Sequence, residues 1–202
     1  MRGTFGLLAG VLCVGVLSGS AIGEVYTLSG MCENEQFSPG FGGADQFPFA
    51  GESVLSDVSF SFSYDSDALP YEIDGGIARY ELDGSTSSFT FGANTFSFDT
   101  VRIIVGTTQF GNGLISMSGT NDALGVDAGI QFESIAPIGS GLPTSFDLND
   151  FDLFRAFSMN SDQNQFLLPI LFGSVTDASL VPAPGAMVVL GLGGVFSGRR
   201  RR

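Results

Sequence analysis

Apolar and polar residues alternate with a period of two over most of the chain. In the clearest run, between Val54 and Tyr64, apolar side chains occupy most of one parity, and Ser59, Ser61 and Ser63 lie on the other. This alternation predicts a strand with one buried and one solvent-facing side, as in antiparallel sheets. Comparable runs predict further strands at 25–31, 76–82, 87–91, 95–99, 100–107, 113–120, 125–133, 166–172 and 173–180.

Turn-forming residues separate these runs. Residues 33–53 and 136–150 contain glycine, proline and serine in the combinations typical of connections. Segment 151–157 fits two patterns, because its phenylalanines have helical spacing while alternation also describes it. About eight to ten short strands with a turn roughly every ten residues predict an all-β fold, an antiparallel β-sandwich of jelly-roll type.

Both ends of the chain differ from this pattern. Arg2, an apolar run at 5–17 and small residues at 18–23 are typical of a secretory signal peptide. Cleavage after Ala21 or after Gly23 fits the small-residue rule, and we favour Gly23. At the other end, residues 178–198 carry no charge and four arginines follow. The sequence therefore divides into a signal peptide at 1–23, a β-domain at 24–180 and a C-terminal sorting or anchor segment at 181–202.

The C-terminal segment has three parts. Pro182 and Pro184 disfavour helix before Gly185, so we expect a short transmembrane helix over 186–198, about 20 Å long. The basic cluster at its end is expected to act as a stop-transfer signal on the cytoplasmic side. This cluster consists of Arg199, Arg200, Arg201 and Arg202.

Composition narrows the function of the β-domain. All 21 acidic residues of the chain lie in it, opposed by only three arginines and no lysine, which gives a formal charge of −18. Nucleic-acid binding, which requires lysine and arginine, is not expected. The chain has no histidine, so Ser-His-Asp and Cys-His mechanisms and His-based metal sites are excluded within it. We expect no enzymatic activity; a carboxylate-based hydrolase is a remaining alternative.

Because the side chains available as ligands offer only oxygen atoms, calcium is the most compatible metal, although no cofactor is expected. The candidate ligands form two groups, Asp65 and Asp67 in one, and Asp147, Asn149, Asp150 and Asp152 in the other. Neither group has the spacing of an EF-hand loop, and both also suit ordinary turns. Once the signal peptide is removed, Cys32 is the only cysteine, so no intrachain disulfide forms and we expect a buried thiol.

The C-terminal tail begins with the motif Val181, Pro182, Ala183 and Pro184, and the short apolar helix and the arginine cluster follow it. This arrangement resembles the PEP-CTERM sorting signal of Gram-negative bacteria. The end of the strand around Tyr64 also resembles the domain common in such proteins. The residues that carry this resemblance are Phe60, Phe62, Tyr64, Asp65 and Asp67. The resemblance implies recognition and cleavage by an exosortase, a membrane protease, and release to the cell surface or the extracellular polysaccharide. Ala183 departs from the family, which has glutamate at this position.

Together these features predict a secreted, non-enzymatic surface or extracellular-matrix protein. We expect it to use Sec-type export machinery, to contact the membrane through its C-terminal helix, and to be processed by an exosortase-like protease. Two alternatives remain: a calcium- or carbohydrate-binding β-sandwich module, with extracellular polysaccharide as a partner, and a permanently tail-anchored envelope protein.

Overall fold

The computed structural model describes residues 24–37, 52–161 and 171–183. Strands dominate these residues, and every strand pairing is antiparallel, so the all-β prediction is confirmed. The elements are β1 (Val25–Phe37), β2 (Val58–Asp65), β3 (Glu72–Asp74), β4 (Ile77–Asp83), β5 (Ser88–Phe91), β6 (Asn94–Ser97), β7 (Thr100–Thr107), β8 (Gly113–Asn121), β9 (Val126–Ser134), the 3-10 helix η2 (Leu148–Asp150), β10 (Phe154–Ser161) and β11 (Leu171–Pro182).

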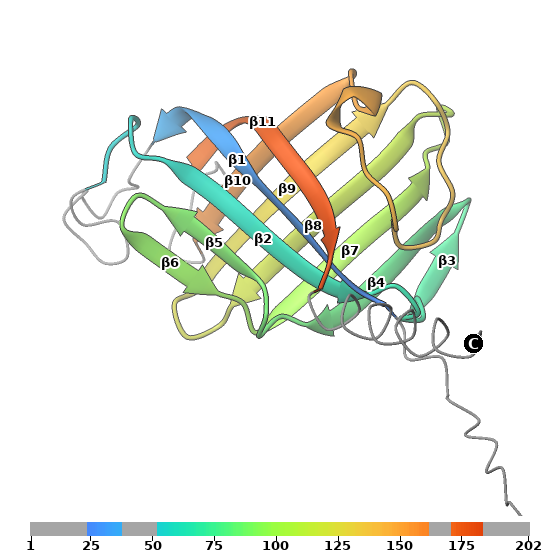
Figure 1. Cartoon of the computed structure of the whole chain (residues 1–202), viewed down its shortest axis with the longest axis horizontal. Coiled ribbons are helices and arrows are strands. Elements are labelled where there is room, and N and C mark those ends of the chain that lie inside the picture. Colours follow the sequence, from blue (N-terminus) through green and yellow to red (C-terminus); the bar gives the residue numbers. More distant parts are fainter. Residues whose placement is uncertain (1–23, 38–51, 162–170, 184–202) are drawn as a thin grey trace, which may run out of the picture.

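These strands form one curled sheet of two facing layers. The strand order is β3-β4-β7-β8-β9-β10-β11-β1-β2-β5-β6. Figure 1 shows β1, β2, β5 and β6 crossing in front of β7, β8 and β9. The predicted sandwich of two separate sheets is therefore replaced by two layers of a single hydrogen-bonded sheet.

Strand β11 connects the two layers. Its first part pairs with β10 from Met159↔Leu171 to Ala156↔Ser174, while the strand pairs with β1 along almost its whole length. Two register irregularities interrupt the β1–β11 pairing, next to Cys32 and next to Gln36. Irregularities of this kind bend a strand and increase its twist, which lets the sheet pass from one layer into the other.

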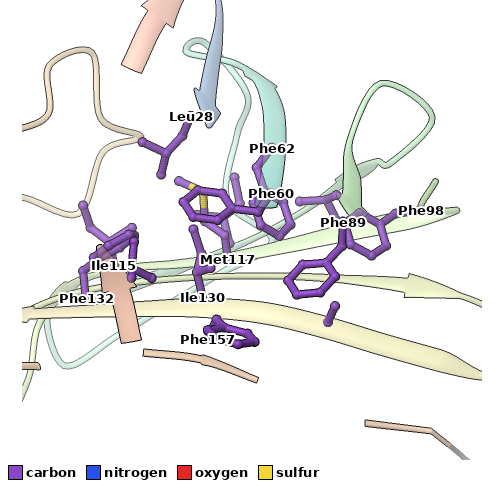
Figure 2. Close-up of a cluster of buried hydrophobic side chains, with 14 of the residues drawn as sticks. Leu28, Phe60, Phe62, Phe89, Phe98, Ile115, Met117, Ile130, Phe132 and Phe157 are labelled. Carbon is purple, nitrogen blue, oxygen red and sulfur yellow. The ribbon is translucent and has the colours of Figure 1, made fainter. Parts of the chain in front are cut away.

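The space between the layers is filled by the apolar parity of the strands. Phe62 of β2 and Phe89 of β5 are fully buried, as are Met117 of β8 and Phe157 of β10. Figure 2 shows these side chains gathered in one cluster, and the rings of Phe89 and Phe157 meet across the layers at a centroid distance of 6.0 Å. The alternation in the sequence therefore marks the buried side chains correctly.

Several strand boundaries differ from the sequence prediction. β1 runs through Phe37, into a stretch that we predicted as loop, because β11 pairs with it along that length. β2 begins only at Val58: Ser53 and Ser56 form a turn before it, and Leu55 is 89% exposed. The predicted strands at 166–172 and 173–180 are one strand from Leu171 onward, and residues 166–170 lie outside the described part.

The ambiguous segment 151–157 is strand from Phe154 onward and irregular before it. Phe157 lies opposite Ile130 of β9 in β10, and only the preceding residues Leu148–Asp150 form a single 3-10 turn. Pairing with β9 thus overrides the helical spacing of the phenylalanines. The described residues contain no helix long and apolar enough to cross a membrane. The predicted signal peptide and the helix at 186–198 lie outside the described residues.

The long connection between β9 and β10 covers one end of the space between the layers. Three hydroxyls bind its carbonyl oxygens: Tyr64 donates to Pro143 at 2.7 Å, Tyr80 to Ser140 at 2.8 Å and Thr107 to Ile138 at 2.8 Å. Its residue Leu142 is buried. Since Tyr64 belongs to the front layer and Tyr80 to the back layer, this connection fastens the two layers to each other at this end.

Candidate functional site

The residues of the predicted sorting motif continue strand β11. Val181 pairs with Thr27 and Pro182 with Tyr26, and the backbone N–H of Ala183 donates to the carbonyl of Val25 at 2.7 Å. The strand thus extends two residues past the predicted domain boundary at 180. Pro184 and the cluster Arg199–Arg202 lie outside the described residues.

A proline is tolerated at position 182 because of the pairing geometry. The bond from Ala183 to Val25 makes this pair the hydrogen-bonded type, so the adjacent pair, Pro182 and Tyr26, is the non-hydrogen-bonded type, whose N–H groups point away from the partner strand. β10 pairs with β11 only as far as Ser174. The missing N–H of Pro182 therefore faces an edge that β10 does not reach, where proline is allowed.

The beginning of the predicted mature chain lies beside this motif. Glu24 accepts a hydrogen bond from the Tyr26 hydroxyl at 2.7 Å, and its carbonyl oxygen accepts one from the N–H of Ser66 at 3.1 Å. Val25 then pairs with Asp65 on one side and binds Ala183 on the other. The first and last described residues of the domain are thus fixed at the same place in the sheet (Figure 1).

The two predicted calcium groups are used locally as turn formers. The Asp65 carboxylate accepts the backbone N–H of Asp67 at 2.9 Å. The Asp147 carboxylate caps η2, accepting both the backbone and the side-chain N–H groups of Asn149 at 2.9 Å. Over the described ranges, no three acidic or cysteine side chains converge on a point where a metal ion would bind, and Asp150 and Asp152 add no further ligand group there.

Replacing the cap tests this assignment. Asp147→Ala is expected to lower the free energy of unfolding by about 1 kcal/mol, because the backbone and side-chain N–H groups of Asn149 lose their acceptor. Chemical unfolding followed by circular dichroism measures the change. The loss should be the same in chelator and in millimolar calcium, with Asp150→Ala as the control. A loss that grows when calcium is added would instead identify Asp147 as a calcium ligand.

Cys32 is buried, and it has no disulfide partner among the described residues, which confirms the expected buried thiol. Burial raises the pKa of its thiol to about 12. Because the thiolate is the nucleophilic form, the thiol is unreactive near neutral pH. Cys32 therefore belongs to the packing between the layers.

The structure also contains a groove that the sequence did not indicate. It lies on the solvent-facing side of β8, β9, β10 and β11, and consists of two cavities of about 230 and 520 Å³ that share the residues Phe154, Ala156 and Phe172. We call it the outer groove. The alternation marks its residues only as the exposed parity of their strands, and a local pattern contains no information about which exposed faces adjoin.

A third cavity, of about 790 Å³ and separate from the outer groove, lies under the β9–β10 connection. Val105 and Ile115 line it from the sheet, and Leu142 and Phe146 from the connection. Two of the predicted calcium ligands, Asp147 and Asp150, also line it. The ring of Phe146 stacks on Phe151 and meets Phe132 edge-on, both at 5.0 Å, so this cavity adjoins the core.

The outer groove contains two carboxylates, and a pair of carboxylates is what the alternative of a carboxylate-based hydrolase requires. Glu35 and Asp152 line the same cavity, and Arg155 lines it too. The Ser174 hydroxyl donates to Glu35, while the Arg155 guanidinium donates to the carbonyl oxygen of Phe151.

Comparison with other proteins adds no relative. No protein-family model matches the chain, and no match was found among curated proteins or among solved structures.

Proposed function

We propose that this chain is an exported, non-enzymatic β-module of the cell surface or extracellular matrix. Sec-type machinery exports it by the signal peptide at 1–23, and an exosortase-like membrane protease processes it near Val181–Pro184. The observation that carries the proposal is the pairing of the motif with the start of the mature domain, Pro182 with Tyr26 and Ala183 with Val25.

This pairing suits a domain presented at a membrane. The signal peptide precedes Glu24 and the apolar segment follows Pro184, so both leave the folded domain from one place. A domain held at one such place keeps the rest of its acidic surface in water, where a formal charge of −18 favours solubility. Four arginines then hold the end of the chain on the cytoplasmic side until the motif is cut.

Mass spectrometry of the C-terminus tests the proposal. In its native host, the mature protein is expected to begin near Glu24, to end near Pro184 and to be recovered from the surface or medium fraction. A membrane-bound chain that retains Arg199–Arg202 would support the tail-anchored alternative and overturn cleavage. As a matched pair, replacing these four arginines by serine should reduce correct processing, and replacing them by lysine should preserve it because the positive charge is kept.

Ala183 provides a second variant. The family to which the motif bears a resemblance has glutamate at this position, and the Ala183 contact with Val25 uses only backbone atoms. Ala183→Glu therefore leaves this hydrogen bond in place while it restores the family residue. The expected result is processing at least as complete as in the parent chain, measured by the same C-terminal analysis.

A further inference from the structure

The outer groove runs across four neighbouring strands. Adjacent strands in a sheet lie about 4.8 Å apart, so the distance from β8 to β11 is about 14 Å. Its two cavities meet at Phe154, Ala156 and Phe172, which makes them one continuous depression. A depression of this shape suits an extended chain rather than a compact small molecule.

The floor of the outer groove is low because its central residue has no side chain. Gly129 of β9 lies between Ser118 of β8 and Ser158 of β10, which are its direct partners on either side. In the next row Ala156 of β10 pairs with Gln131. A bound chain would thus contact the small side chains of this floor and lie between the larger side chains at its borders.

Two aromatic rings border this floor. Phe154 is 41% exposed at the start of β10, and Phe172 of β11 pairs with Ser158 on the same outward face. Hydroxyl and amide groups from Ser116, Asn160 and Gln131 line the same cavity. Gln131 donates to Glu133 at 2.7 Å, which fixes the orientation of its amide. Apolar rings combined with a few oriented polar groups are typical of binding sites that recognise polar ligands.

The charges around the outer groove disfavour anionic chains. Asp127, Glu35 and Asp152 line it, against a single Arg155 whose guanidinium is bound to the backbone. An anionic chain would meet net repulsion here, within a domain that is itself strongly acidic. Hydroxyl-rich chains without charge avoid this repulsion and can use both the ring faces and the polar groups.

We propose that the outer groove binds a segment of an uncharged polysaccharide chain, with Phe154 and Phe172 packed against sugar rings and Ser158, Asn160 and Gln131 hydrogen-bonded to hydroxyl groups. This deepens the proposed function, on which it rests only for its biological setting, by naming the class of matrix partner. Binding itself depends on the folded domain and not on how the tail is processed.

Binding is measured with the full-length chain in detergent, by titration with cellohexaose, maltohexaose and xylohexaose. At least one of these uncharged oligosaccharides should bind. Phe154→Ala and Phe172→Ala should each weaken that binding about tenfold or more, as expected when an aromatic contact is removed. The matched control is Phe110→Ala, which truncates a phenylalanine that is 81% exposed in a turn away from the outer groove.

A variant that fills the outer groove with a larger side chain distinguishes loss of the binding site from unfolding of the domain. Ser158→Tyr should block the outer groove and abolish binding while the thermal midpoint stays near that of Thr90→Tyr, which also introduces a tyrosine in place of a small hydroxyl residue, on β5 of the other layer. Failure of all three uncharged oligosaccharides to bind would overturn the proposal. So would stronger binding of an oligogalacturonate or a chitosan hexamer, or unchanged binding by Ser158→Tyr. None of these results alters the C-terminal mass, which tests sorting separately.

Discussion

Phe62→Ala is expected to unfold with a free energy about 3–5 kcal/mol lower than the parent chain. Phe62 is fully buried between the layers, with its ring stacked on Phe98 at 5.5 Å and tilted against Phe60 at 6.2 Å (Figure 2). Truncation removes apolar area from the core and leaves a cavity that the surrounding side chains cannot close fully. Urea unfolding followed by far-ultraviolet circular dichroism measures the difference.

The control for this variant is again Phe110→Ala. The same atoms are removed, but Phe110 is 81% exposed, so the change in stability should stay within about 0.5 kcal/mol. Equal losses in the two variants would mean that Phe62 does not lie in the packed space between the layers. A large loss only at Phe62 supports the facing arrangement of β2 and the strands behind it.

Gly173→Ala is expected to lower the free energy of unfolding by about 3 kcal/mol, at the upper end of what overpacking usually costs. Gly173 lies on β11 between Asn34 of β1 and Phe157 of β10, where the strand passes from one layer to the other. An added methyl group would overlap the carbonyl oxygen of Glu33 and press on the Phe157 ring. The carbonyl belongs to the backbone of a paired strand, so it cannot move without disturbing the β1–β11 pairing.

Gly139→Ala is the matched change in open space. An alanine side chain at position 139 meets no atom within 4 Å, so its effect should lie within about 0.5 kcal/mol. Chemical unfolding of both variants provides the comparison. If Gly173→Ala were as stable as Gly139→Ala, β11 could not approach β1 and β10 as closely as the structure has it, and the connection between the layers would need revision.

Binding of a ligand in the outer groove and export of the chain are expected to depend on different parts of this fold. Export depends on the two ends of the domain, which are fixed together through Val25 and Ala183. The outer groove lies where β8, β9, β10 and β11 adjoin, and its residues come from chain segments far apart in sequence, such as Ser118 and Phe172. A variant at one place is therefore expected to leave the other intact, which allows sorting and ligand binding to be measured independently.

The sequence by itself determined which side of each strand is buried. Phe60, Phe62 and Phe89 lie on the apolar parity of their segments, and all three are in the core. This succeeded because burial of one face of a strand imposes a period of two that is visible within a few residues. The lack of histidine and the expected export segments were equally local features of the sequence.

Only the tertiary structure decided which strands are neighbours. The partners Tyr26 and Pro182 lie near opposite ends of the chain, and nothing in either segment specifies the other. Pairing of residues 32–37 with the first part of β11 extended β1 beyond its predicted end, and pairing with β9 converted the ambiguous segment around Phe157 into strand. The outer groove was missed for the same reason: alternation specifies the face that each residue takes, whereas a site on a sheet depends on the order in which strands from distant segments come together.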